Sequence, residues 1–191
     1  RAMGRHYLSE HSDSPTKGYL YILDDLLDNV EICGEINLGT SEIPLGKILG
    51  TRTAARSNAF AGNFMPLLPE NTEFGAKWCK LYESHIREGI REPIKVYEYL
   101  NRYFVQEGNK RVSVLKYLGA VSIEARVTRL IPKRDESNKQ ISIYYEFLDF
   151  DRRATFDNLW FSHRGGFTGL VNLAETWQHD HPECQTPTAD L

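Results

Sequence analysis

The central stretch of the chain limits its fold more than any other part of the sequence, because strand, turn and helix signals follow one another there without a break. Residues 94–99 and 103–106 alternate apolar and polar side chains on either side of Asn101-Arg102, which predicts a hairpin with a two-residue turn. Residues 109–118 carry apolar side chains at helical spacing and are followed by a glycine, a frequent helix stop. Two strands should therefore lead into a helix through Gly108.

The flanking segments predict further strands and helices around this centre. In order they are a helix over 19–30, a strand pair or one long irregular strand over 31–45, a loop with short helical turns over 46–69, a helix over 73–89 and a strand over 121–131. Helices and strands are therefore both expected in this part of the chain.

Charge and turn residues divide the chain into four expected parts. Residues 1–18 are interpreted as a cloning remnant followed by a flexible N-terminus, and residues 19–132 as the main domain. A charged linker opens a C-terminal α/β extension over 133–178, and 179–191 form a polar, flexible tail.

The extension itself contains three expected elements. Residues 141–150 fit either a helix or a strand, 158–162 a short extended piece, and 167–177 a helix. In that last helix Leu170, Leu173 and Ala174 are expected to face inward.

The composition excludes some classes of protein. A formal net charge of -3 and a pI near 6.1 argue against a protein whose whole surface is basic enough to bind DNA. Local basic patches are compatible with these values. The three cysteines show no CxxC spacing, and no apolar run approaches the ~20 residues that cross a bilayer. We therefore expect a cytoplasmic protein with no membrane role.

The turn Gln106-Glu107-Gly108-Asn109-Lys110-Arg111 carries the chemistry that the sequence predicts. A glycine that joins a strand to a helix leaves the first helical N–H groups without partners, and the helix dipole adds positive charge at the same point. Cations are disfavoured at a helix N-terminus unless an anion lies there. Lys110 and Arg111 therefore favour an anion-binding turn over a helix start that merely carries solvated basic residues.

Residues 90–130 resemble the core of the ParB/sulfiredoxin family, and their motifs are similar to the pattern of the ParB N-terminal domain. The segments that carry the resemblance are Ile90-Arg91-Glu92-Pro93-Ile94-Lys95-Val96, Tyr103 to Arg111 and Lys116-Tyr117-Leu118-Gly119-Ala120. They match a Pro-Ile-x-Val strand, a strand entering a Gly-x-x-Arg turn, and a helix that closes with Lys-x-x-Gly. Ile43-Pro44-Leu45, with Ile48 and Arg52, is similar to the family's opening strand. The resemblance implies an α+β fold of the ParB/sulfiredoxin type, in which helices flank a small mixed β-sheet.

The resemblance also implies a ligand. In this family the Gly-x-x-Arg turn holds nucleotide phosphates: CTP in ParB clamps, and ATP or ADP in sulfiredoxins and free-serine kinases. By position, Gly108, Asn109, Lys110 and Arg111 would line the phosphate site, with Arg52 as a second contact and Mg²⁺ bound with the nucleotide. Asn109 stands where sulfiredoxins have their cysteine, so that activity is not expected.

The sequence departs from the ParB pattern at two further points, and both bear on a role in DNA partition. Ser113 replaces the second arginine of ParB proteins, and the chain after Lys133 is too short for their helical DNA-binding module.

Three functions are compatible with these observations. The first is a ParB-like nucleotide-binding module with a regulatory or DNA-associated role, which is compatible with a homodimeric protein. The second is a triphosphatase or small-molecule phosphotransferase of the free-serine-kinase branch, in which Glu107 and Glu42 are the candidate catalytic carboxylates. The third is a DNA-binding protein that keeps the fold without a nucleotide.

Two weaker motifs lie in the C-terminal part. Like the Gly108 turn, the turn Ser162-His163-Arg164-Gly165-Gly166 places basic residues and glycine directly before an expected helix, an arrangement that can bind an anion. A tight loop that needs two glycines for its backbone conformation explains this turn better. His179, His181 and Cys184 have metal-ligating side chains but offer no fourth ligand at a regular spacing, so no metal site is predicted.

Overall fold

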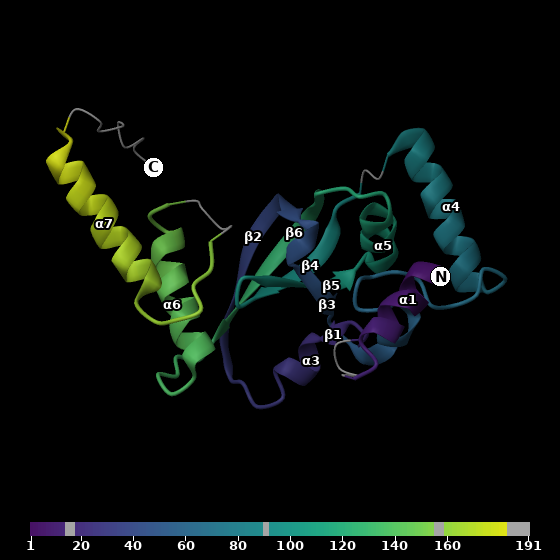
Figure 1. Ribbon diagram of the computed structural model, residues 1–191, viewed down its shortest axis with the longest axis horizontal. Coiled ribbons are helices and arrows are strands. Elements are labelled where there is room, and N and C mark those ends of the chain that lie inside the picture. The colour runs from purple at the N-terminus through teal and green to yellow at the C-terminus, as the bar shows by residue number, and fades with distance from the viewer. Residues whose placement is uncertain (14–17, 90–91, 155–158, 183–191) are drawn as a thin grey trace. The chain divides into compact units, whose positions relative to one another are not determined.

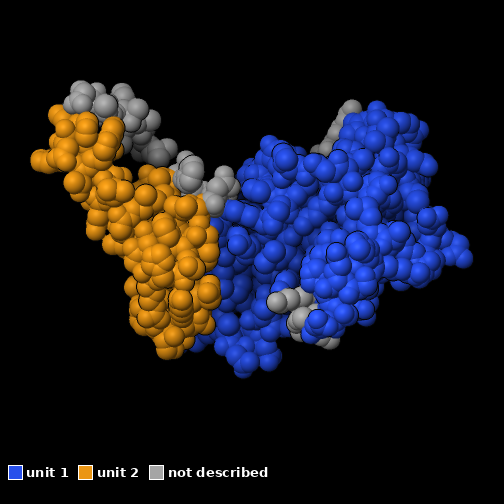
Figure 2. All heavy atoms as spheres, viewed as in Figure 1, with its two compact units in different colours: residues 1–133 blue, residues 134–191 orange. Residues whose placement is uncertain are grey.

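The computed structural model describes residues 1–13, 18–89, 92–154 and 159–182. The chain forms two compact units, Arg1–Lys133 and Arg134–Leu191, shown in blue and orange in Figure 2. None of the described helices is long and apolar enough to cross a membrane.

A six-stranded mixed sheet is the centre of the first unit (Figure 1). Its elements in chain order are α1 (Ala2–Glu10), β1 (Tyr21–Ile22), α3 (Leu23–Leu26), β2 (Ile32–Pro44), η1 (Leu45–Lys47), β3 (Ile48–Thr51), η2 (Ala54–Ala59), α4 (Glu73–Glu88), β4 (Ile94–Tyr99), β5 (Arg102–Glu107), α5 (Asn109–Tyr117) and β6 (Ser122–Pro132). The strands lie in the order β1-β3-β5-β4-β6-β2. The mixed sheet flanked by helices that the sequence predicts is confirmed.

The strand directions decide where the Gly108 turn lies. β1, β3 and β5 run parallel, so their carboxyl ends share one edge of the sheet. β4 runs antiparallel to β5 and parallel to β6, so both begin at that same edge. Gly108 follows β5 directly and therefore lies at the carboxyl edge of the parallel strands, where α/β sheets commonly bind ligands.

One face of the sheet packs against helices and forms the main core. Ile94, Val96, Val105 and Val127 from the three central strands are almost fully buried there. The buried residues that cover them from outside the sheet are Phe60, Phe64, Phe74, Val112 and Leu115. Because α5 contributes two of these, its position on the sheet is fixed by apolar burial.

The opposite face is apolar over one half only. Leu23, Tyr99, Phe104 and Leu130 form a second cluster, which α3 and the segment after it help to cover. The other half of this face carries polar and charged side chains from β4, β6 and β2, which are exposed or partly exposed.

The β4–β5 hairpin turns one residue earlier than the sequence predicts. Its turn is Leu100-Asn101, with φ values of 51° and 58°, the left-handed pair that a two-residue hairpin turn needs. A buried carboxylate holds this turn: Glu98 Oε1 accepts a hydrogen bond from the Asn101 N–H at 2.6 Å, and Glu98 Oε2 accepts one from Arg129 Nε at 2.6 Å.

The helix predicted over 19–30 is wrong for most of its length. Tyr21–Ile22 form β1, and only Leu23–Leu26 are helical. The reason lies far along the chain, because β1 pairs with β3 and the Tyr21 carbonyl lies against Gly50. A Cβ at Gly50 would be 1.9 Å from the Tyr21 oxygen, so this pairing needs glycine there.

The start of the chain and the segment 46–69 also differ from the predictions. Ala2–Glu10 form helix α1 instead of a flexible N-terminus. Gly4 in this helix is buried against the Pro66 carbonyl, which a Cβ would approach to 2.9 Å. The predicted loop over 46–69 contains the short strand β3 as well as helical turns. The predictions for 31–45, 73–89, 109–118 and 121–131 are confirmed by β2, α4, α5 and β6.

The described residues of the second unit form two helices, α6 (Lys139–Asp151) and α7 (Gly166–Asp180), and no strand. The expected α/β extension is therefore helical in its described part. Stacked and edge-on rings join the helices and the segment between them through Tyr144, Phe147, Phe150, Trp160 and Phe167.

The inward face predicted for α7 is wrong. Phe167 is buried, whereas Leu173 is 67% exposed and Ala174 is also exposed; Leu170 is partly buried. Phe167 packs against Phe147 and Phe150 of α6, so this position marks the covered side of α7. α7 runs to Asp180, and the rest of the predicted flexible tail from residue 183 lies outside the described residues.

Replacing Glu98 by alanine should destabilise the protein by about 3–5 kcal/mol, because it removes a buried carboxylate that pairs with Arg129 and holds the hairpin turn. The Glu98 side chain is 1% exposed and that of Arg129 15%. Urea unfolding measures the effect. Glu83→Ala, at an exposed position of α4, is the control and should change stability by less than about 0.5 kcal/mol. A Glu98→Ala loss no larger than the control's would contradict the role of this network.

Lys116 predicts a pH dependence of stability. Burial lowers the pKa of its ammonium group from 10.5 to about 8, while its Nζ donates to the Ile48 carbonyl at 3.1 Å. Below pH 8 both the folded and the unfolded chain hold the proton and the full penalty for the buried charge applies. Between about 8 and 10.5 only the unfolded chain keeps the proton, so stability rises with pH through this window.

The total gain should be on the order of 3 kcal/mol, since one pKa unit corresponds to about 1.4 kcal/mol. Unfolding in urea at a series of pH values measures it. The variant Lys116→Met should show a flatter profile between pH 7 and 10.5. An equally steep profile in the variant would assign the dependence to other groups.

Candidate anion site at the Gly108 turn

The turn into α5 depends on glycine. Gly108 has φ 110° and ψ 18°, a left-handed backbone conformation that residues other than glycine rarely adopt. A Cβ at this position would also lie 2.5 Å from Cγ2 of Ile94, at the start of β4. Glycine is thus required both for the backbone conformation and for the close approach of the turn to the neighbouring strand.

The N-terminus of α5 has no side-chain cap. Gly108 is the N-cap residue, and the first helical hydrogen bond runs from the Val112 N–H to the Gly108 carbonyl at 3.1 Å. Within the described residues, the N–H groups of Asn109 and Arg111 meet no acceptor. The first turn contains no acidic residue, so nothing on the helix itself offsets the positive end of its dipole.

A pocket of about 290 Å³ lies beside this turn. It is lined by Phe60, Phe74, Gln106, Glu107, Gly108, Asn109 and Lys110. The Lys110 ammonium group lies over the Phe74 ring, 4.9 Å from its centroid. The pocket therefore combines backbone donors and one cation with an apolar wall.

Asn109 ties the turn to the parallel strand β3. Its Nδ2 donates to Thr51 Oγ1 at 3.3 Å, and the Thr51 hydroxyl donates to the Val105 carbonyl at 3.1 Å. Because the threonine proton is already engaged, Thr51 Oγ1 accepts from Asn109, which fixes the orientation of the amide. Asn109 Oδ1 is left buried without a hydrogen-bond partner.

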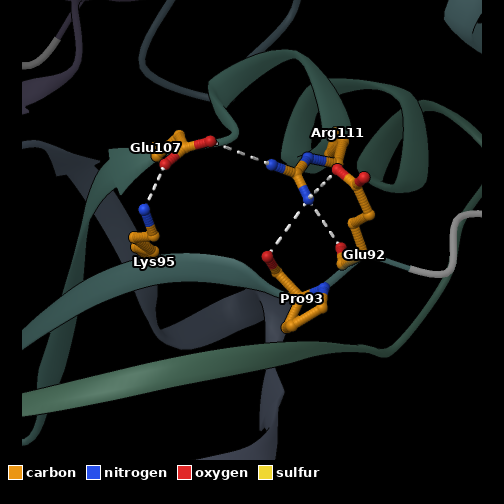
Figure 3. Close-up of polar contacts among 5 residues, drawn as sticks. All are labelled: Glu92, Pro93, Lys95, Glu107 and Arg111. Atoms are coloured by element: carbon orange, nitrogen blue, oxygen red, sulfur yellow. Dashed lines mark hydrogen bonds and ion pairs between the residues drawn. The ribbon is translucent and has the colours of Figure 1, made fainter.

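Arg111 points toward the start of β4, as Figure 3 shows. Its Nη1 donates to the carbonyls of Glu92 at 2.6 Å and Pro93 at 3.1 Å. The guanidinium also lies 3.8 Å from a carboxylate oxygen of Glu92 and of Glu107, and its side chain is 14% exposed. This differs from the expected ligand contact: Arg111 fastens α5 to the segment that enters β4.

Glu107 lies between two cations (Figure 3). Its Oε2 is 2.7 Å from Lys95 Nζ, and its Oε1 faces Arg111. The hydrogen bond from Lys95 and the positive charge of that residue lower the pKa of the Glu107 carboxyl. Glu107 therefore remains an anion with reduced basicity, which makes it a poor general base in this arrangement.

Two other predicted site residues do not reach the pocket. The Arg52 guanidinium lies over the Tyr97 ring and donates to the Tyr97 hydroxyl at 2.6 Å, and Arg52 lines a separate pocket that includes Asp24. Glu42 lies on β2, with β6 and β4 between it and β5, and accepts a hydrogen bond from the Ser122 hydroxyl. The structure thus brings Gly108, Asn109 and Lys110 together and leaves Arg52 and Glu42 elsewhere.

The second glycine-rich turn has a different explanation. The Gly165 N–H at the start of α7 donates to both carboxylate oxygens of Glu146, at 2.8 and 2.9 Å, so a side chain of the protein already occupies this position. A Cβ at Gly166 would lie 2.3 Å from the Phe161 ring, which explains the second glycine. His179 and His181 are exposed, and Cys184 lies outside the described residues.

Sequence reasoning missed Thr51, Phe60, Phe74 and Lys95. Thr51 reaches the turn because β3 and β5 are parallel neighbours, and Lys95 because β4 is the antiparallel partner of β5. The hairpin signal places Lys95 near the end of β5, but only the register shift between Lys95 and Val96 puts it opposite Glu107. Nothing local to Thr51 or Phe60 indicates that they adjoin Gly108.

No family model and no curated protein matches the sequence. Eight solved chains match the fold, and two of them illustrate the similarity. Sulfiredoxin from Arabidopsis thaliana is 24% identical, with a TM-score of 0.32, and the match covers 46% of this chain and 82% of that one. A Pnob8-like ParB-N domain is 12% identical, with a TM-score of 0.33; the match covers 80% of this chain and about half, 52%, of that one. Both have the ParB/sulfiredoxin fold. Similarity at this level carries no argument about ligands.

Replacing Arg111 by alanine should lower the free energy of unfolding by about 1.5–3 kcal/mol, because it removes charged hydrogen bonds to two backbone carbonyls in a largely buried position. Chemical denaturation measures this loss. Arg87→Ala, at an exposed position in the last turn of α4, serves as the control and should stay within about 0.5 kcal/mol. If Arg111→Ala is as stable as the control, the guanidinium does not fasten α5 to β4.

Proposed function

We propose that this protein binds a nucleotide whose phosphate groups lie against the Gly108 turn, as a ParB-like module with a regulatory or DNA-associated role. The nucleotide is CTP, ATP or ADP with Mg²⁺. Gly108 and the amides of Asn109 and Arg111 would contact the phosphates, and Lys110 would offset their charge.

The uncapped N-terminus of α5 is the observation that carries this proposal. The positive end of the dipole of α5, a helix of nine residues, lies at Gly108. The first turn of this helix carries two cationic side chains and no acidic one. Arg111 is paired with Glu92 and Glu107, so Lys110 is the cation that adds positive potential beside the pocket, where a bound anion would be favourable. Glu107, the neighbouring carboxylate, is already paired with Lys95 and Arg111 and so opposes a phosphate less than a lone carboxylate would.

Arg111 has a positioning role in this proposal. By holding the carbonyls of Glu92 and Pro93 it keeps the turn close to β4, where Gly108 meets Ile94. The first amides of α5 are then oriented before the ligand arrives, which reduces the entropy lost on binding. Asn109 adds to this through its bond to Thr51.

The phosphotransferase alternative has less support. It needs a carboxylate that can accept a proton near the terminal phosphate. Glu107 lines the pocket, but its pKa is lowered and its oxygens face two cations. Glu42 lies on β2, which is separated from β5 by two strands, β4 and β6. No second carboxylate lines the Gly108 pocket among the described residues.

Calorimetric titration with CTP, ATP, ADP and GTP, each with and without Mg²⁺, tests the proposal. Lys110→Gln should weaken binding of the preferred nucleotide about tenfold, which corresponds to the loss of one charge-assisted contact of roughly 1.4 kcal/mol. Lys80→Gln, at an exposed position of α4, removes the same charge elsewhere and should leave the affinity unchanged. The absence of binding to all four nucleotides would refute the proposal and favour a DNA-binding protein that keeps only the fold.

A further inference from the structure

The open half of the second sheet face contains a groove that is separate from the Gly108 pocket. The two share only Gln106 in their linings. The groove has a volume of about 300 Å³, and its lining residues are Asn37, Gly39, Thr40, Lys95, Val96, Gln106, Arg126, Val127 and Thr128.

Strand register explains why polar side chains gather there. Glu107, Lys95, Arg126 and Thr40 are successive Cα partners on β5, β4, β6 and β2, so they form one row across the sheet face. Thr128, with Asn37 as its partner on β2, belongs to the next row. Five donor-bearing side chains are thus fixed on rigid strands.

Bulges form the two walls of the groove. The register of β2 against β6 shifts between Asn37 and Gly39, and Gly39 has a left-handed φ of 77°. On the other side the register of β4 against β5 shifts at Lys95, which makes Gln106 the extra residue of β5. A bulge bends its strand and re-aims side chains, and it is often found next to functional sites.

Arg126 is the distinctive residue of this groove. It lies on β6, inside the sheet and not at its edge, and its side chain is exposed. Within the described part of the chain it makes no hydrogen bond or ion pair, whereas Lys95 is paired with Glu107. Its planar guanidinium therefore keeps all of its donors for a ligand, in the geometry that suits a phosphate group.

The surroundings limit the size and kind of ligand. Glu42 and Glu124 are Cα partners one row further along the sheet, and both are exposed. Their charges would repel the next phosphates of an extended polyanion such as a nucleic-acid strand. The lining contains no aromatic ring on which a base could stack, while Thr40, Thr128, Asn37 and Gln106 can bond hydroxyl groups.

We propose that this groove binds a small phosphorylated molecule that carries hydroxyl groups, of the sugar-phosphate class. Arg126 and Lys95 would hold the phosphate, and the threonine, asparagine and glutamine side chains would bond the hydroxyls. This site lies beyond the nucleotide proposed for the Gly108 turn, and each can exist without the other.

Titration with ribose 5-phosphate, inorganic phosphate and ribose at constant ionic strength tests the proposal by calorimetry or by NMR shifts. Ribose 5-phosphate should bind the wild-type protein most tightly, inorganic phosphate more weakly and ribose not at all. Arg126→Gln should weaken ribose 5-phosphate binding at least about tenfold, the effect of losing one charged bidentate contact. The melting temperature should change little, because Arg126 is exposed and makes no hydrogen bond or ion pair among the described residues.

Two further variants make the outcome decisive. Arg87→Gln removes the same charge from α4, is the control and should leave binding unchanged. Lys110→Gln reports any ribose 5-phosphate that binds at the Gly108 turn instead of the groove. No binding at millimolar ligand, an equal loss in Arg87→Gln, or a loss in Lys110→Gln and not in Arg126→Gln would overturn the proposal. So would tighter, Arg126-dependent binding of a short single-stranded DNA, which would assign the groove to nucleic acid. Failure of nucleotide binding at the Gly108 turn would leave the Arg126 result unaffected.

Discussion

The close approach of Gly108 to the start of β4 is the constraint on which the rest of the site depends. The backbone of the turn lies where a Cβ would strike Ile94, and Arg111 holds the two segments together through the carbonyls of Glu92 and Pro93. As a result α5 begins at a defined point on the carboxyl edge of the parallel strands. A looser turn would leave the first amides of α5 without a fixed direction, and a binding site gains little from donors that must first be ordered.

Charged side chains lie on both sides of the sheet edge at which the Gly108 turn is located. Lys95, Glu107 and Arg111 form a chain of ion pairs, in which the charges of these side chains from β4, β5 and α5 offset one another. Lys110 beside the Gly108 pocket and Arg126 in the sheet-face groove lie on either side of that chain. The same ion-paired cluster thus separates two concave surfaces with different chemistry: backbone amides and an apolar wall in one, and strand-borne polar side chains in the other.

Predictions from the sequence succeeded where neighbouring residues determine the structure and failed where distant ones do. The hairpin and α5 follow from alternation, a turn pair and helical spacing within one short stretch. Tyr21–Ile22 instead form a strand because Gly50, far along the chain, leaves room for the Tyr21 carbonyl. Leu173 was expected inward on α7, yet only the position of α6 decides which face of α7 is covered, and it is Phe167 that packs against α6.

The sequence by itself determined that a glycine joins a strand to a helix and that two cations follow it, since these are facts of composition and order within six residues. Only the tertiary structure decided that the two cations have different partners. Lys110 remains at the pocket over Phe74, whereas Arg111 turns to the carbonyls before β4. Adjacent residues on a helix point about 100° apart, and what each one meets depends on which strand lies beneath it. The groove around Arg126 was invisible in the sequence for the same reason, because cross-strand register assembles it from four separate segments.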